Sequence, residues 1–559
     1  MPKRARTSNR PIDPARLAVF ESLASSIAEE MGATLRQTAL SPNIKERADY
    51  SCAVFDAEGR LLAQAAHIPV HLGAMPESVR AVAGLAPWTP GDIAILNDPF
   101  LGGTHLPDVT MVSPVFRVSA ARGRSGRPIG FVASRAHQAD IGGMAPGSMP
   151  VASELVQEGF IIPPVRLYRA GALVPETLAL FLRNVRTPEE RRGDVDAQIA
   201  AQRVGERRLA ALLERFGPAG FRRAADALLD SGERAALAAM ATIPPGVYTF
   251  ADALDDDGVT DEPVPIQVRL AARTDGWHLD FTGSAPQRPA SINAVAAVTR
   301  SASYYVLRCL LPAEAPTNAG LFRPMRFTLP ERSVVNAAPP VAVAAGNVET
   351  SQRIVDVVWG AIAQALPDRM PAASSGTMNN LAAGGIDPRS GAPWAYYETS
   401  GGGLGAGPEG PGLRAAHSHM TNTLNTPAEA LEIAYPLRVL ENSIRRGSGG
   451  RGAHRGGDGL IRRTQFLGPG TVTVISDRRR RGAWGRAGGG DGKPGRNRLE
   501  HANPEGTSPQ RRGRPRSQSL PGKITIAVQA GDVIRLETPG GGGWGTPPPR
   551  RTGTKPSSR

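Results

Sequence analysis

Glycine and proline are the residues that most constrain this 559-residue chain, with 64 and 50 copies. Glycine-rich stretches stand at 400–412, 447–459 and 541–544. Both residue types interrupt regular helices, and glycine permits tight backbone turns. We therefore expect a loop-rich, enzyme-like protein and not a helical bundle. The glycine runs are explained equally well by tight turns and by backbone N–H groups presented to an anion.

Hydrophobic periodicity predicts a mixed α+β fold, in which helices pack on several β-sheets. Apolar residues recur at helical spacing after Asp13, a good N-cap that is followed by Pro14 at the first helical position. Other segments have helical or strand patterns. We expect helices over 175–240 and 351–366, a hairpin over 51–64, and strands over 91–98, 109–116, 128–137, 246–282 and 523–537.

The length indicates roughly two to four structural units. The predicted division is a disordered arm at 1–12, an N-terminal α/β part at 13–245, a central β-rich part at 246–470, a C-terminal β part at 471–546, and a disordered tail at 547–559. The segment near 486–520 is unusually rich in Arg, Pro and Ser, and we interpret it as an atypical basic insertion.

The formal net charge of +14 comes mainly from arginine and concentrates in 462–465, 477–486 and 510–518. A basic nucleic-acid-binding protein is therefore one alternative. No zinc finger, RNP motif or helix-turn-helix accompanies the charge, so we favour an arginine-biased composition and do not expect nucleic acid as a partner. Cys52 and Cys309 form no CxxC pair. With no signal-peptide pattern and no apolar run of about 18 residues, we expect a cytoplasmic protein that does not span a membrane.

A cluster of acids and histidines is the clearest chemical signal. The run LNDPFLGGTHLPD contains Asp98, His105 and Asp108, and SRAHQAD contains His137 and Asp140. These residues lie at or near the ends of predicted strands, and the H-x-x-D spacing occurs twice. Carboxylate and imidazole groups suit Mn, Fe or Zn. The alternative is that each Asp caps a turn and each His is packed or exposed.

Further polar residues are candidates for substrate contacts or acid–base chemistry. Glu398 lies in YYETSGGG and is a candidate general base, while turn capping and packing are the alternatives. The candidates for substrate binding are His67, His71, His417 and His419.

Long motifs across the chain resemble the hydantoinase B family. This family includes B subunits of ATP-dependent N-methylhydantoinases, the C-terminal half of 5-oxoprolinases, and alpha subunits of acetone and acetophenone carboxylases. The resemblance covers roughly residues 13–546. It rests on LNDPFLGGTHLPDVTMVSPVF, SRAHQADIGGMAPGSMP, QAAHIPVHLGAMPESV, LDFTGSAPQ, NAGLFRP, AHSHMTNTLNTPAEALE, RGGDGLIRR and GDVIRLETPGGGGWG.

The resemblance implies a divalent metal, with Mn(II) expected first and Zn(II) or Fe(II) as alternatives. Its implied ligands are Asp98, His105, Asp108 and His137, with Asp140 as an alternative ligand. His137 and Glu398 are the expected catalytic residues.

The resemblance also implies an A-type ATPase partner subunit that binds ATP. The stretch GGGDGKPG has Pro494 where a P-loop needs Ser or Thr, so we predict no cofactor-binding residues in this chain.

We therefore expect the B-type catalytic subunit of a hetero-oligomeric, ATP-dependent cyclic amide hydrolase that opens a hydantoin or 5-oxoproline-like ring. An alpha subunit of an ATP-dependent ketone carboxylase is the alternative within the family. Those subunits tend to be longer than this chain.

Overall fold

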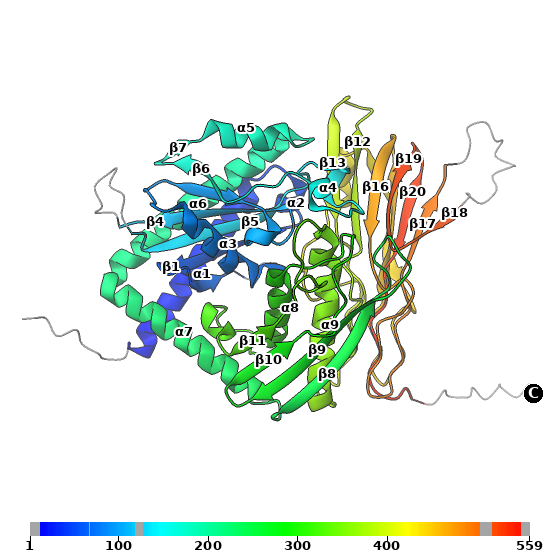
Figure 1. Ribbon diagram of the computed structural model, residues 1–559. Coiled ribbons are helices and arrows are strands. Elements are labelled where there is room, and N and C mark those ends of the chain that lie inside the picture. Colours follow the sequence, from blue (N-terminus) through cyan, green and yellow to red (C-terminus); the bar gives the residue numbers. More distant parts are fainter. Residues whose placement is uncertain (1–11, 66–67, 118–126, 503–516, 549–559) are drawn as a thin grey trace, which may run out of the picture.

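The computed structural model describes residues 12–65, 68–117, 127–502 and 517–548. In these residues the chain forms four sheets with helices packed around them (Figure 1), which confirms the mixed α+β prediction. The predicted arm at 1–12 and tail at 547–559 lie almost wholly outside the described residues. No described helix is long and apolar enough to cross a membrane.

The first sheet has seven antiparallel strands in the order β2-β1-β5-β4-β3-β6-β7. Its strands are β1 (Tyr50–Asp56), β2 (Leu61–Gln64), β3 (Ile93–Leu96), β4 (Asp108–Val115), β5 (Gly130–His137), β6 (Val165–Arg169) and β7 (Ala172–Leu173). Both faces are covered, which explains why β1, β4 and β5 are buried along their whole length.

Long helices cover one face of this sheet and a short helix covers the other. On the first face lie α1 (Pro14–Thr38), α6 (Pro188–Phe216) and α7 (Pro218–Met240), whose apolar residues share a core with β1 and β5. Helix α3 (Ala74–Val82) packs on the opposite face. Asp13 caps α1 and Pro14 opens it, as predicted. The smaller helices here are α2 (Pro42–Lys45), α4 (Leu155–Glu158) and α5 (Pro175–Arg183), with 3-10 turns at η1 (Pro69–His71), η2 (Ala83–Leu85), η3 (Pro99–Leu101) and η4 (Pro146–Ser148).

A second sheet has four strands in the order β11-β10-β9-β8 and packs against two helices. The strands are β8 (Gly246–Leu254), β9 (Val264–Arg273), β10 (Gly276–Asp280) and β11 (Met325–Thr328). The helices are α8 (Ala296–Cys309) and α9 (Ser351–Ala365), with η5 (Ala319–Phe322) beside them. A single π-helical turn, η6 (Gly346–Thr350), leads directly into α9.

The last two sheets pack face to face as a β-sandwich, seen on the right of Figure 1. One has the order β13-β12-β16-β19 and the other β14-β15-β20-β17-β18. Their strands are β12 (Asn380–Ile386), β13 (Pro393–Glu398), β14 (Leu437–Arg445), β15 (Gly459–Phe466), β16 (Gly470–Ile475), β17 (Arg496–Glu500), β18 (Ser517–Leu520), β19 (Lys523–Val528) and β20 (Val533–Glu537), with α10 (Ala428–Ala434) beside them. Strands β17 and β18 fall inside the segment predicted as a basic insertion, so its described ends belong to the sheet.

The glycine runs pack against one another as extended segments. Gly541 donates its N–H to the carbonyl of Gly457 at 3.0 Å, and Gly450 donates to the carbonyl of Gly541 at 2.9 Å. A Cβ atom on Gly541 would lie 2.1 Å from the carbonyl oxygen of Leu404, and one on Gly456 would lie 2.0 Å from that of Gly541. Only glycine allows backbones this close, so these runs are packing elements.

Candidate active site

Three neighbouring strands bring the predicted histidines and acids to one edge of the first sheet. Asp49 precedes β1, Asp108 begins β4 and His137 ends β5. Because β5 is antiparallel to both neighbours, these positions share an edge, and Asp108 and His137 are paired in register. The N–H of His137 donates to the carbonyl of Asp49 at 3.0 Å. With His71 and His105, these residues line one cavity, which we call the His/Asp pocket.

Asp108 is the carboxylate at the centre of the His/Asp pocket. Its Oδ2 lies 3.3 Å from Nε2 of His71 and 3.3 Å from Nε2 of His105, and the hydroxyl of Thr104 donates to it. Burial by itself would raise the pKa of Asp108. The two histidines outweigh burial and hold this pKa well below its usual value. Asp108 is therefore a carboxylate in the folded protein.

His71 enters the pocket from η1 and is only 1% exposed. Its Nδ1 lies 2.8 Å from the hydroxyl of Ser51, which fixes the ring while Nε2 meets Asp108. Burial lowers the pKa of His71. The ring is thus held on both nitrogens by β1 and β4.

The ring of His137 is held from two sides. Nδ2 of Asn43 lies 3.0 Å from its Nδ1 and donates to its carbonyl oxygen at 2.6 Å. The ring of Tyr397 stacks on it at a centroid distance of 4.4 Å and an interplanar angle of 8°. Burial, followed by the charge of His105, lowers the pKa of His137 well below its usual value, so the ring is neutral. Its Nε2 is buried and has no hydrogen-bond partner among the described residues.

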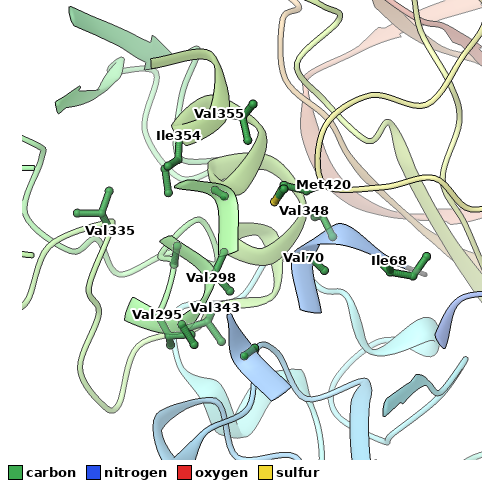
Figure 2. Packing of buried hydrophobic residues seen from close by; sticks show 14 of the residues in the cluster. Ile68, Val70, Val295, Val298, Val335, Val343, Val348, Ile354, Val355 and Met420 are labelled. Carbon is green, nitrogen blue, oxygen red and sulfur yellow. The ribbon is translucent and has the colours of Figure 1, made fainter. Parts of the chain in front are cut away.

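The cavity is small, with a volume of about 20 Å³. Its apolar wall comes from segments that are distant in sequence, and Figure 2 shows Ile68, Val70, Val348 and Met420 packed in one cluster. The remaining polar lining is contributed by Asn347, Thr399 and Thr421. This volume holds about one water-sized group. The arrangement therefore surrounds a single small site with carboxylate and imidazole groups.

Asp49 and Arg47 connect the pocket to the β-sandwich. Burial raises the pKa of Asp49 to about 6, although Arg47 opposes this shift. Arg47 NH2 lies 3.7 Å from the Asp49 carboxylate, and the guanidinium stacks over the Tyr397 ring at 5.0 Å. Tyr397 comes from β13, so the sandwich contributes one wall of the site.

Two acids in the predicted ligand set are engaged elsewhere. Asp98 is half-buried and caps η3 by accepting from the N–H of Phe100 at 2.9 Å. Asp140 forms an ion pair with Arg186 at 2.9 Å and accepts from the backbone of Gly142. Neither residue lines the pocket. The backbone does fold back, since Gly103 donates to the carbonyl of Asp98 at 2.9 Å, but the Asp98 carboxylate stays with its own turn.

The other predicted residues are dispersed. Glu398 lies outside the pocket lining, where it accepts from Arg462 at 3.0 Å and from Asn425 at 2.8 Å. His419 pairs with Asp356 at 3.1 Å. His417 lies on the same segment, and both of its ring nitrogens are buried without a partner. His67 lies outside the described residues.

The residues of the pocket fit a divalent ion by their chemistry. Within the described part of the chain, no three His, Cys, Asp or Glu side chains have the arrangement of a formed metal site. Nevertheless, Nδ1 of His105 and Nε2 of His137 are buried without a partner among the described residues, and both histidines line the same cavity as Asp108. Buried polar atoms normally have partners, and imidazole with carboxylate is a donor set for Mn, Zn or Fe.

Sequence reasoning missed three residues that shape the pocket, namely Asn43, Asp49 and Tyr397. Asp49 had the same signal as the predicted acids, because it stands next to a predicted strand. No sequence signal marked Asn43 or Tyr397. Asn43 contacts His137 across 94 residues of sequence, and Tyr397 contacts it from the β-sandwich.

Comparisons with known proteins agree with this architecture. The model of the hydantoinase B/oxoprolinase family matches residues 13–547. The chain belongs to this family. It is 39% identical to an uncharacterised protein of Methanocaldococcus jannaschii, with 96% of this chain and 91% of that protein covered.

The chain is 36% identical to 5-oxoprolinase 1 of Arabidopsis thaliana over 96% of its own length, but it spans only 42% of that relative. Among solved structures, the ATP-dependent caprolactamase of Pseudomonas jessenii matches with a TM-score of 0.86 and 28% identity. That match covers 97% of this chain and 93% of the other. That solved chain and the present one therefore have nearly the same extent.

Proposed function

We propose that this chain is the B-type hydrolytic subunit of an ATP-dependent enzyme that opens cyclic amides. The observation that supports this most is the His/Asp pocket, a cavity of about 20 Å³ whose lining combines a buried carboxylate with two histidines that each have an imidazole nitrogen without a partner among the described residues. A purely structural cluster would pair these atoms, because unmet buried hydrogen bonds cost free energy. The similarity to a caprolactamase and to 5-oxoprolinases supports cyclic amides as the substrate class.

In this proposal His105, Asp108 and His137 hold a divalent ion, Mn(II) first and Zn(II) or Fe(II) as alternatives. His71 orients the Asp108 carboxylate, because it is itself fixed by Ser51. Asn43 and Tyr397 hold the His137 ring in place. When bound, such an ion supplies polarisation of a carbonyl or phosphoryl oxygen and a lowered pKa of water.

The apolar wall of the pocket restricts access of bulk water. Ile68, Val70, Val348 and Met420 are each at most 4% exposed. Exclusion of bulk water strengthens the electrostatic interactions of Asp108 with a reacting group and protects an activated intermediate from unproductive hydrolysis. Asp49, on the same wall, offers a second carboxylate that can accept a proton from the attacking water.

Ring activation is assigned to a partner. Unstrained cyclic amides are hard to hydrolyse, and phosphorylation of the amide oxygen creates a better leaving group. We propose that an A-type ATPase subunit performs this step and that the two subunits form a hetero-oligomer. The 5-oxoprolinase relative is more than twice as long as this chain, which is consistent with an additional functional part in one polypeptide.

Co-expression with an A-type ATPase subunit tests the assignment. ATP hydrolysis is measured with hydantoin, 5-oxoproline or caprolactam, and separately with acetone and bicarbonate. We expect a cyclic amide to stimulate ATP hydrolysis and to be opened in proportion. If only acetone with bicarbonate stimulates ATP hydrolysis, the protein is a carboxylase and not a hydrolase. If none of these compounds stimulates it, the proposed function is refuted.

A further inference from the structure

Arg47 is a fully buried cation whose hydrogen bonds leave one donor unused. Its NH1 donates to Asn43 and to the carbonyl of Tyr397 at 2.9 Å. Its NH2 donates to the hydroxyl groups of Thr399 at 3.0 Å and Thr423 at 3.4 Å. Among the residues that the structure describes, the Nε–H has no partner although the side chain is 0% exposed.

The charge of Arg47 is incompletely compensated by its surroundings. All of these hydrogen-bond acceptors are neutral. The Asp49 carboxylate is the only opposite charge within ion-pair distance among the described residues, at 3.7 Å, which is beyond a hydrogen bond. A buried cation normally has a paired and hydrogen-bonded anion. The described residues therefore compensate the charge of Arg47 only in part.

His417 is a second side chain with unmet hydrogen bonds close to Arg47. Both of its ring nitrogens are buried and unpartnered, and so is the hydroxyl of Ser418. Burial and then the charge of Arg47 lower the pKa of His417 to about 4, so the neutral ring has one donor and one acceptor. Two buried ring nitrogens of one histidine that both lack a partner are unusual in a folded protein.

The segment that carries His417 is fixed against Arg47 by backbone contacts. The N–H of Leu424 donates to the carbonyl of Arg47 at 2.9 Å, and Nε2 of Gln352 donates to the carbonyl of Ser418 at 3.0 Å. Met420 and Thr421, a few residues further along, line the His/Asp pocket. Arg47 therefore bonds directly to two residues of the pocket lining, Tyr397 and Thr399, and His417 precedes two others on a segment that is bonded to Arg47.

We propose that Arg47 and His417 form an oxyanion subsite that adjoins the His/Asp pocket. An oxyanion accepts the Nε–H of Arg47 and the ring N–H of His417, and its charge compensates the guanidinium. This inference rests on the proposed function, which it extends by assigning an anionic group to the species that the pocket receives. Two sources share this chemistry: a carboxylate on the ring of the substrate, and the phosphoryl group of the activated intermediate.

Calorimetric binding to the full chain, without ATP or turnover, tests this subsite. The probes are inorganic phosphate and a matched pair, L-5-oxoproline and 2-pyrrolidone, which share a ring and differ by a carboxylate. The test variant is His417→Leu, and the control is His278→Leu, because His278 lies in β10, does not line the His/Asp pocket, and has its Nε2 2.8 Å from the hydroxyl of Thr328. His417→Gln keeps a donor and an acceptor at the same position.

We expect the wild-type chain to bind an oxyanion probe and His417→Leu to weaken that binding at least tenfold. His417→Gln should recover part of the loss, and His278→Leu should behave like the wild type. If the preference for 5-oxoproline over 2-pyrrolidone disappears in His417→Leu, the anion is the carboxylate of the substrate. If only phosphate binding is lost, it is the phosphoryl group.

A melting temperature for each variant separates binding from folding. Because His417→Leu removes two unsatisfied buried atoms, its melting temperature should equal or exceed that of the wild type. Oxyanion binding that is absent from the wild type, or unchanged in His417→Leu, would overturn the subsite. A chain that binds phosphate through His417 but opens no ring with its partner would refute the proposed function and leave the subsite standing.

Discussion

Two buried polar clusters in this protein differ in how completely their polar groups are paired. The first is the His/Asp pocket. The second, here called the Arg/Asp network, consists of Asp252, Arg353, Asp356, Asp477, Arg478 and Lys523. In the network each charge has an opposite charge within 3.2 Å, for example Arg353 with Asp477 at 2.8 Å and Arg478 with Asp356 at 2.8 Å.

This difference indicates that the Arg/Asp network stabilises the fold, whereas the His/Asp pocket serves the reaction. The network joins β8, α9, β16 and β19, and its charges compensate one another, as expected of a structural junction. The pocket leaves imidazole nitrogens unpaired beside one carboxylate. Such groups remain in a fold when a ligand satisfies them. Loss of a network residue should therefore reduce stability, whereas loss of a pocket residue should reduce activity.

The largest expected effect is on the network. Arg353→Ala leaves Asp252, Asp356 and Asp477 with too little positive charge in a buried site. We expect the free energy of unfolding to fall by about 3–5 kcal/mol. Urea denaturation measures it. The control Arg192→Ala breaks an ion pair in which both side chains are about half exposed, and should change stability by less than about 1 kcal/mol. If both variants lose the same free energy of unfolding, the network has no special role in stability.

The second prediction concerns the pocket itself. We expect His105→Ala to lower ring-opening activity roughly 100-fold or more and to lose bound metal, with a smaller loss of stability than Arg353→Ala. Elemental analysis of the purified chain measures metal content, and His278→Ala is the matched control. Metal content equal to that of the wild type would remove His105 from the proposed ligands.

The third prediction concerns Asn43, which supports the pocket by holding the His137 ring. Asn43→Ala removes the contact with Nδ1 of His137, so the ring loses its fixed orientation. We expect metal affinity or activity to fall about 10–100-fold. Titration with Mn(II) measures the affinity, and Asn184→Ala, at the exposed end of α5, is the control. A variant with unchanged affinity would show that stacking by Tyr397 alone orients His137.

The smallest effect is a pH dependence of stability that belongs to the network. Burial would raise the pKa of Asp356 and of Asp477, but cationic neighbours outweigh it and hold both pKa values at about 2. Because both fall below the unfolded value of roughly 3.9, this stabilisation is present above pH 4 and is lost as the pH falls from about 4 to 2.

Urea denaturation from pH 6 to pH 2 measures this loss. Asp356→Asn should show a shallower decrease over the same range, because one of the two titrating groups is absent. A decrease as steep as that of the wild type would exclude Asp356 as a contributor.

The arginine-rich stretches show what composition alone could not predict, namely whether their charges are exposed or paired inside the fold. The basic stretches at 462–465 and 477–486 made nucleic-acid binding one alternative, while an arginine-biased composition was the favoured interpretation. In the structure Arg462 pairs with Glu398, Arg463 with Glu500, and Arg478 with Asp252 and Asp356. Much of this charge is therefore internal and compensated. Composition cannot reveal this, because the partners come from other strands.

Local patterns predicted the elements well. Asp13 and Pro14 marked the start of α1, and the alternating segments gave β1, β2, β4 and β5 nearly at their bounds. Spacing also identified His105 and Asp108, because an H-x-x-D loop brings both side chains together within one turn. Asp98 shows the limit of spacing, since a carboxylate beside a turn satisfies the nearest N–H group.

The sequence by itself determined the helices, the strands, the family and the small group of acids and histidines from which the site is built. These depend on interactions between residues close in the chain, or on long motifs. Only the tertiary structure decided that Asp49 and Tyr397 join that group, that His71 lies against Asp108, and that Asp98, Asp140 and Glu398 lie outside the pocket lining. The physical reason is that the pocket forms where the edge of one sheet meets a β-sandwich some 250 or more residues later, and only packing sets which side chains meet there.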